Sequence, residues 1–439
     1  MRRMGVAPAF ASAAADADCG ARHQVMMRLL PFLFLLYITN YIDRTSVAFA
    51  ALGMTSDLGL SDRELGLAAG IFFFGYIPLQ VPGALLVEHW SARRVIAAGM
   101  VAWGACTALT GLAHSASQLY LARLVLGAAE AGFFPGVIVY LTHWFSRADR
   151  AKTAAYFTAA IPLSQAIASP LAGWIVGHSW AGIQGWRWLF ILEGLPAVLL
   201  GAIGYFFLTD RPRHARWLSA AQREWLEEQQ LADKAPTGAP QPRIAQVIRS
   251  PIVLLLATAC LLSYFVGYGF FFWFPSMLKR QSSLSDAWVG VIGAIPYVVL
   301  FLAMLVNGWH SDRHMERRWH AAIPCFLAAI GALALTARFE SLPALVLLFT
   351  MIALAVAYLP VFWAIPTTLL TSSAAATAVG FINAVASLAG FAAPYMLGDL
   401  STRTGSFAVG MAAICVIAVG AGLLVLCVPK ARLSGAAAF

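Results

Sequence analysis

Long apolar runs separated by short polar connections organise the chain. A bilayer span takes about 20 apolar residues, and twelve runs close to that length occur along the 439 residues. They fall at 29–50, 66–87, 95–114, 118–142, 153–177, 187–209, 251–276, 287–310, 320–337, 342–366, 374–398 and 406–428. This pattern predicts an all-α membrane protein with twelve transmembrane helices.

One longer polar segment divides the runs six and six. Residues 210–250 are rich in charge and end in a proline-rich stretch, which predicts a linker with a short amphipathic helix near Ala220–Leu231. The predicted organisation is a flexible cytoplasmic tail at 1–25, a six-helix half at 26–209, a cytoplasmic linker at 210–250, a second six-helix half at 251–429 and a cytoplasmic tail at 430–439.

Composition excludes several classes of protein. The chain is 60% hydrophobic and 11% charged, whereas about one quarter of the residues in a soluble protein are charged. The net charge is +9, but the cations lie between apolar runs and are not clustered on one exposed face, so no nucleic-acid partner is expected. The six cysteines make no metal-ligand spacing, and we expect neither a metal nor a cofactor.

The positions of the cations predict an orientation. With the N-terminus inside, 21 of the 29 lysines and arginines fall in cytoplasmic segments and six in outer segments. Cations are retained on the cytoplasmic side of membranes. We therefore expect a multi-pass protein of a bacterial inner membrane with both termini in the cytoplasm. Trp273 and Trp288, near predicted span ends, are interpreted as interfacial residues.

Two loops carry the same pattern and indicate an internal repeat. Residues 84–94 read A-L-L-V-E-H-W-S-A-R-R, and residues 308–318 read G-W-H-S-D-R-H-M-E-R-R. Each has a small residue, an acid four positions later, and two arginines five and six residues past the acid. The repeat predicts two related six-helix halves around a central site.

These loops resemble the signature G-x-L-a-D-r-x-G-r-r of the major facilitator superfamily. The second copy departs from it at Met315, and the first departs at Ala84, Glu88, His89 and Ser91. The resemblance implies the major facilitator fold. It also implies a cytoplasmic gate made of Glu88, Arg93, Arg94, Asp312, Arg313 and Arg317. The alternative is that these charges only fix the membrane topology.

Five further stretches are similar to the anion:cation symporter branch of that superfamily. They are N-Y-I-D-R-T-S-V-A-F-A at 40–50, R-L-V-L-G-A-A-E-A-G-F-F-P-G at 123–136, G-W-R-W-L-F-I-L-E-G-L-P at 185–196, F-W-A-I-P-T-T-L-L at 362–370 and G-F-I-N-A-V-A-S-L-A-G-F-A-A-P-Y at 380–395. Members of this branch take up organic acid anions, such as sugar acids, tartrate or aromatic carboxylates, together with protons.

Ionisable residues inside predicted spans are costly and are functional candidates by default. Asp43 and Arg44 lie in the first run, and Arg123 and Glu130 lie in the fourth, two helical turns apart. The four charges sum to zero, so protonation of one acid leaves a positive site that favours an anion. We expect Asp43 and Glu130 to carry protons.

The two arginines are the candidate ligands of the anion. Arg44 can hold a carboxylate bidentately, while Arg123 either shares that role or holds Glu130. The alternative for the Asp43–Arg44 pair is a static structural ion pair. The resemblance supports the functional assignment and implies cavity-lining roles for Tyr41, Tyr76, Trp363 and Asn383. In the second half, Tyr264 and Tyr268 are further candidates for substrate contact, with helix packing as the alternative.

One more pair of charges lies in the sixth run. Arg187 and Glu193 are interpreted as an outer-side structural pair and not as substrate groups.

The expected function is proton-coupled import of a small organic acid anion by alternating access. A monomer suffices, because the site lies between halves of one chain, and the expected partners are the anion, protons and membrane lipid. The acid and histidine clusters of a membrane enzyme are absent from the sequence, so enzymatic activity is not expected. The rival interpretation is a proton-driven exporter of amphipathic organic compounds.

Overall fold

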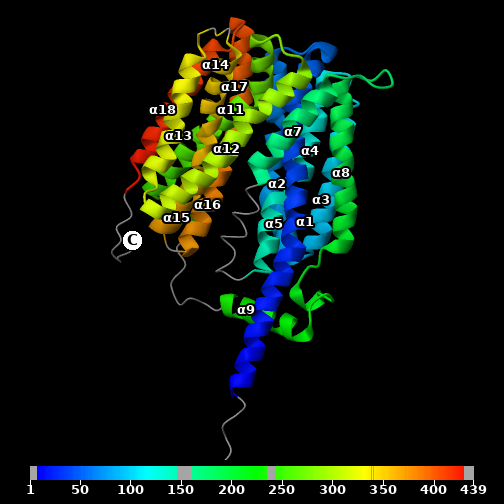
Figure 1. The fold of residues 1–439 in the computed structure, drawn as a ribbon, viewed down its shortest axis with the longest axis vertical. Coiled ribbons are helices and arrows are strands. Elements are labelled where there is room, and N and C mark those ends of the chain that lie inside the picture. Colours follow the sequence, from blue (N-terminus) through cyan, green and yellow to red (C-terminus); the bar gives the residue numbers. More distant parts are fainter. Residues whose placement is uncertain are drawn as a thin grey trace, which may run out of the picture.

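The computed structural model describes residues 7–145, 160–234, 243–337, 339, 341–370 and 372–429. Two groups of helices stand side by side, α1 to α8 in one and α11 to α18 in the other (Figure 1). The first group contains α1 (Ala7–Leu58), α2 (Asp62–His89), α3 (Ala92–Thr110), α4 (Ala116–Glu130), α5 (Phe133–Thr142), α7 (Ala160–Val176) and α8 (Gly185–Phe207).

The second group contains α11 (Pro251–Gln281), α12 (Asp286–His314), α13 (Arg318–Ala334), α14 (Leu342–Ala353), η2 (Leu354–Tyr358), α15 (Leu359–Leu369), α16 (Ser372–Ser387), α17 (Ala389–Thr404) and α18 (Ala408–Leu426). Three short elements lie between the two groups in the sequence: η1 (Pro212–His214), α9 (Ala220–Lys234) and α10 (Ile244–Ile248).

The described helices account for all twelve predicted spans. Nine segments are long and apolar enough to cross a bilayer, with α4–α5, α14–α15 and α16–α17 each forming one of them despite a local break. Two further spans are the shorter apolar helices at Ile161–Val176 and Arg318–Ala334. The twelfth span is the 19-residue α3. The prediction of an all-α membrane protein is therefore confirmed.

The beginning of the chain differs from the prediction. Residues 7–25 were expected to form a flexible tail, but they belong to α1. Their alanine-rich composition favours a helix, and Ala21 and Val25 are buried in one apolar cluster with Leu226 of α9. The helix predicted in the linker is present as α9, and it lies beside the start of α1 beyond one end of the bundles, called here the α9 end (Figure 1).

At the opposite end, called here the closed end, the two groups pack through glycines. A Cβ atom added to Gly66 of α2 would lie 2.4 Å from the Pro394 carbonyl oxygen of α17. A Cβ on Gly173 of α7 would lie 2.6 Å from the Asp286 carbonyl oxygen of α12. One buried apolar cluster also contains residues of both groups, including Phe49 of α1. The backbones thus meet directly across the interface.

Polar contacts add to this closure. Arg280 at the end of α11 donates to both carboxylate oxygens of Asp62 at the start of α2, at 2.8 and 2.5 Å. Ser401 donates to the same carboxylate at 2.6 Å, and Arg63 lies 3.6 Å from Asp399. Within the described part of the chain, the ion pairs that join the two groups all lie at this end.

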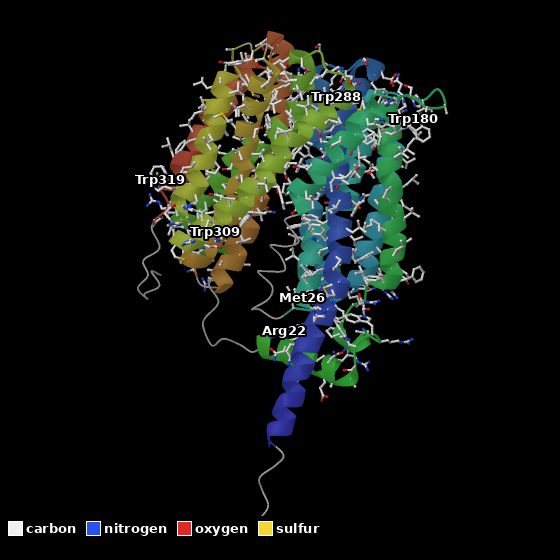
Figure 2. All side chains as sticks on the ribbon, viewed as in Figure 1. Arg22, Met26, Trp180, Trp288, Trp309 and Trp319 are labelled. Carbon is white, nitrogen blue, oxygen red and sulfur yellow. The ribbon has the colours of Figure 1, made fainter. Side chains whose placement is uncertain are left out.

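Tryptophans mark both ends of the bundle. Trp288 lies at the closed end and is 57% exposed, as expected for an interfacial residue, while Trp309 and Trp319 lie toward the other end (Figure 2). The same expectation for Trp273 is wrong. Its side chain is fully buried, and its ring N–H donates to the Pro394 carbonyl oxygen at 3.0 Å. It therefore stabilises packing between α11 and α17.

The first repeated loop is held inside its own half. The Glu88 carboxylate lies 2.6 Å from His143 Nε2, and its backbone carbonyl accepts from Arg211 at 3.0 Å. The Asp210 carboxylate accepts from the Arg93 backbone N–H and from the Ser91 hydroxyl, both at 2.9 Å. Ser91 replaces the second glycine of the repeat, and there it adopts extended backbone and caps α3.

The second repeated loop is closed by different contacts. Asp312 pairs with Arg317, and the Arg313 guanidinium lies 5.5 Å from the Trp309 ring, while Arg94 makes the comparable contact with Trp90 at 5.7 Å. Partial burial raises the pKa of Glu316, but backbone N–H donors at the start of α13, including that of Trp319, outweigh it and keep the pKa below its usual range. The described side chains of the predicted gate therefore contact their own halves.

Met315 occupies a backbone conformation that suits glycine. Its φ of 51° is left-handed, and its side chain is 65% exposed, so no packing compensates for the crowded Cβ. We expect Met315→Gly to raise the free energy of unfolding by about 0.5–1 kcal/mol, because relief of that crowding exceeds the cost of added backbone freedom. Thermal unfolding in detergent measures the change, and Met315→Ala, which keeps the Cβ, should gain nothing.

The glycine contacts at the closed end predict a conformational effect. In Gly66→Ala the new methyl group would overlap the α17 backbone, so we expect the closed-end contacts to open while each half stays folded. Cross-linking of a cysteine pair at 63 and 402, in a variant without native cysteines, should fall several-fold. Gly380→Ala is the matched control, because nothing lies within 4 Å of the added Cβ. Equal cross-linking in both variants would contradict this interpretation of the interface.

Candidate functional site

A cavity of about 190 Å³ lies between the two groups of helices. Helices α1, α2, α4 and α7 contribute one wall, and α11, α12, η2, α15 and α17 contribute the other. Five predicted site residues line it, namely Tyr41, Arg44, Arg123, Tyr264 and Tyr268. The lining is mostly apolar and aromatic, so the two guanidinium groups are its only charged members among the described residues.

Arg44 is held by an acid and by aromatic rings. Its Nε lies 2.5 Å from Glu130 Oε1, and the Glu130 side chain is 1% exposed. The guanidinium also lies 4.7 Å from the ring centre of Tyr76 and 5.4 Å from that of Tyr41. Such cation–π contacts stabilise a desolvated cation. Glu130 thus forms its ion pair with Arg44. The sequence had also left open a pair between Glu130 and Arg123, and this conformation does not have that pair.

Arg123 has no ion-pair partner among the described residues. Its side chain is buried, and its Nε has no hydrogen-bond partner. Its guanidinium lies 4.9 Å from the Phe72 ring, and the Arg44 guanidinium lies 5.6 Å from the same ring. A buried cation without a carboxylate is costly. Arg123 therefore gives the cavity a buried guanidinium that no described carboxylate engages directly, which suits an anion.

Asp43 lies away from the cavity, although its neighbour Arg44 lines it. Consecutive helical residues point about 100° apart, which separates the two side chains around α1. Asp43 is 3% exposed and faces Thr107 of α3 and Arg123 of α4, and no described lysine or arginine forms an ion pair with it. The alternative that Asp43 and Arg44 form a static ion pair is therefore wrong for this conformation.

Three residues expected to line the cavity lie outside it in this conformation. Tyr76 stacks on Phe72, with ring centres 5.3 Å apart, and lies behind the lining residues Phe72 and Arg44. Trp363 packs in the apolar cluster of the second half, with its ring 5.4 Å from Phe362. Asn383 accepts from the Ser387 hydroxyl at 2.8 Å through its backbone carbonyl.

Other lining residues carried no signal in the sequence. Tyr297 of α12 lines the cavity, and its buried hydroxyl has no hydrogen-bond partner. Gln165 of α7 and Ser263 of α11 add further polar groups. These uncharged side chains do not stand out within an apolar span, so only the packing of α7, α11 and α12 around the cavity reveals their position.

The interpretation of Arg187 and Glu193 as a pair is wrong. Arg187 donates to Asp57 at 2.9 Å and to the carbonyl oxygens of Gly111 and Ala113. The Glu193 carboxylate accepts from the Ser46 hydroxyl of α1. A separation of six residues places two side chains about 120° apart around a helix, whereas pairs form three or four residues apart, so the spacing itself argued against the pair.

Comparisons with known proteins agree with this architecture. The sequence model of the Major Facilitator Superfamily matches residues 33–394. The chain is 37% identical over 398 residues to a "Putative tartrate transporter" of Agrobacterium vitis, covering 90% of this chain and 92% of that protein. It is 36% identical to a "Quinolone resistance transporter" of Acinetobacter baumannii, covering 88% and 90%. It is 33% identical to the "Inner membrane transport protein RhmT" of Escherichia coli, covering 91% and 93%.

The fold is also similar to solved transporter structures. A bacterial homologue of the human lysosomal transporter Spinster, in an inward-facing and occupied conformation, matches with a TM-score of 0.76. The match has 19% sequence identity and covers 92% of this chain and 97% of that chain. At this identity the likeness shows the shared fold alone.

The ion pair between Arg44 and Glu130 predicts a rescue experiment. Arg44→Ala would leave Glu130 buried without its cation, and we expect a loss of about 3–5 kcal/mol in the free energy of unfolding. Adding Glu130→Gln to Arg44→Ala should recover most of that loss, because the amide carries no charge. Thermal unfolding of the purified variants measures both changes, and a double variant as unstable as the single one would contradict the pairing.

Proposed function

Because the chain belongs to the major facilitator superfamily, we propose that it is a proton-coupled symporter that imports a small organic acid anion. Membership makes it a secondary transporter and not an enzyme. The proposal that the substrate is an anion rests on one observation. Arg123 lies buried beside Arg44 in the central cavity, without an ion-pair partner among the described residues.

The two arginines suit a carboxylate substrate. Arg123 is free to bind it, and a guanidinium presents paired N–H groups that match two carboxylate oxygens. Arg44 becomes available when its bond to Glu130 breaks. Two cations near one aromatic ring could hold the two carboxylates of a dicarboxylic acid. The name of the tartrate-transporter relative supports that substrate class.

Proton coupling follows from competition for Arg44. The ionised Glu130 and the substrate carboxylate both need the same guanidinium, so protonation of Glu130 removes the competitor. Proton binding and anion binding then favour each other. Asp43 is the second proposed proton carrier, because it is a buried acid without an ion-pair partner among the described residues.

Alternating access requires that the two ends open in turn. The closed end, joined by Asp62 and Arg280, is proposed to face outward, and the α9 end to face the cytoplasm. The halves proposed at 26–209 and 251–429 would rock about the cavity. In the opposite conformation, the gate residues Glu88, Arg93, Arg94, Asp312, Arg313 and Arg317 would exchange contacts at the cytoplasmic end.

The cellular setting is part of the same proposal. The name of the RhmT relative supports an inner-membrane location, and the distribution of lysine and arginine supports cytoplasmic termini. A monomer suffices, because both walls of the cavity come from one chain.

A second function has a specific observation in its favour. The quinolone-resistance relative is nearly as similar to this chain as the tartrate-transporter relative. The aromatic lining of the cavity also suits amphipathic compounds. Proton-driven export is therefore the competing function, and the direction of transport distinguishes the two.

The deciding experiment is uptake into proteoliposomes under an inward proton gradient. We expect accumulation of one class among tartrate, sugar acids and aromatic carboxylates, and loss of that accumulation when an uncoupler is added. The relevant control is liposomes without protein. No uptake of any acid, together with gradient-driven movement of a quinolone, would replace the proposal with the exporter.

Variants of the charged residues test the roles. Asp43→Asn and Glu130→Gln should abolish uphill accumulation while leaving substrate exchange, because each removes a proton carrier but keeps the shape of the side chain. Arg123→Lys should weaken substrate binding at least tenfold, since the ammonium keeps the charge but loses the planar pair of donors. Normal proton-driven uptake in both acid variants would refute the coupling roles.

A further inference from the structure

A shallow groove opens on the surface of the first half at its α9 end, and it shares no lining residue with the central cavity. Met26, labelled in Figure 2, marks its level on α1. Six of its lining residues follow one another along α1, namely His23, Gln24, Arg28, Pro31, Phe32 and Leu35. The first three are polar and the last three are apolar, so the groove changes character along the helix.

This change coincides with the boundary of the first predicted span. The apolar run begins at residue 29, directly after Arg28. Phe207, the last residue of α8, and Trp217 of the linker also line the groove, and tryptophan is enriched at membrane interfaces. Leu35, within the span, is 45% exposed. The polar part of the groove thus lies at the level of lipid headgroups, and the apolar part lies at the level of acyl chains.

Arg28 is held between two aromatic rings without an acid. Its guanidinium lies 4.6 Å from the centre of the Phe207 ring and 5.0 Å from that of the Trp217 ring. Its Nε is shielded from solvent and has no hydrogen-bond partner, and no described carboxylate forms an ion pair with it. Cation–π contacts stabilise the charge but provide no oxygen acceptor for the N–H groups. An anion in the groove would supply that acceptor.

A phospholipid with a net negative charge matches both parts of the groove. Its phosphate oxygens can accept from the paired N–H groups of Arg28, with His23 as a second polar contact. Its acyl chain can cover the exposed Pro31 and Leu35. A soluble phosphate would use only the polar part, and the headgroup of a zwitterionic lipid carries a cation that offsets its phosphate. Basic sites beside membrane spans favour anionic lipids for this reason.

We infer that this groove is a binding site for one anionic phospholipid. Arg28 holds the phosphate, and one acyl chain lies along Pro31, Phe32 and Leu35. The lipid comes from the leaflet at the α9 end, which is proposed to face the cytoplasm. Because rings of α8 and of the linker hold the same guanidinium, the lipid binds where α1, α8 and the linker meet. The site depends neither on the transported substrate nor on proton coupling.

The test is native mass spectrometry of the purified protein in a neutral detergent, with equal amounts of phosphatidylglycerol and phosphatidylcholine that carry the same acyl chains. We expect wild-type protein to retain phosphatidylglycerol at least threefold over phosphatidylcholine, and Arg28→Gln to lose most of that preference. The matched control is Arg249→Gln, an exposed arginine just before the seventh span, which should keep the preference. No preference in wild-type protein, or an unchanged one in Arg28→Gln, would overturn the inference.

A second variant keeps the test decisive if Arg28→Gln does not insert. Leu35→Trp fills the apolar part of the groove from an exposed position and leaves every charge in place, so it should also lower the retention of phosphatidylglycerol severalfold. Retention equal to that of wild-type protein in Leu35→Trp would contradict the lipid site.

A competition arm separates a lipid from a soluble phosphate. Glycerol 3-phosphate, which has no acyl chains, should not displace phosphatidylglycerol at the same concentration. Displacement would identify the groove as a site for soluble phosphates and would refute the lipid. None of these measurements involves transport, so failure of the lipid site and failure of the proposed function are distinguishable.

Discussion

The cost of placing charge inside a bilayer is the constraint on which this molecule depends. Five ionisable groups lie within the first six helices, and each must find a partner, a proton or a cavity. Arg44 finds Glu130 and three aromatic rings. Arg123 finds one ring and the cavity, while Asp43 faces Thr107 and Arg123 without forming an ion pair with any described residue. Transport chemistry is assigned to Asp43 and Arg123, which form no ion pair among the described residues, and to Arg44 and Glu130, whose ion pair must break.

Close backbone packing at the closed end bears on how the two halves can move relative to each other. The closed end is built from glycines that touch the opposite backbone, and from polar contacts around Asp62 that lie at the surface. Neither kind of contact interlocks long side chains between the halves. These parts of the interface can separate without withdrawing long side chains, whereas the apolar cluster that both halves share must come apart when the closed end opens.

Much of the fold was predictable because hydrophobic length alone specifies spans. The twelve runs, α9 and the four charges of the first and fourth helices were all visible in the sequence. The chain from residue 7 to 25 was misjudged because its polar residues hid a strong alanine-based helix propensity. Trp273 was misplaced since distance from a span end says nothing about which helix covers a side chain.

The candidate site was only half predictable, for a physical reason. Buried charges are rare in spans, so Arg44, Arg123, Asp43 and Glu130 stood out. The partner of each charge depends on helix rotation and on which helices pack together, and periodicity within one helix does not determine either. Glu193 was therefore assigned to Arg187 by proximity in sequence, although packing of α8 against α1 brings it to Ser46.

The apolar cluster shared by both halves has a thermodynamic consequence. Opening the closed end must separate residues such as Phe49 of α1 and Phe274 of α11, which are buried in one cluster. Exposure of apolar surface to water carries a large positive heat capacity, so the enthalpy of opening changes with temperature. The equilibrium between the two conformations, and with it the rate of transport, should follow a curved temperature dependence instead of a straight Arrhenius line.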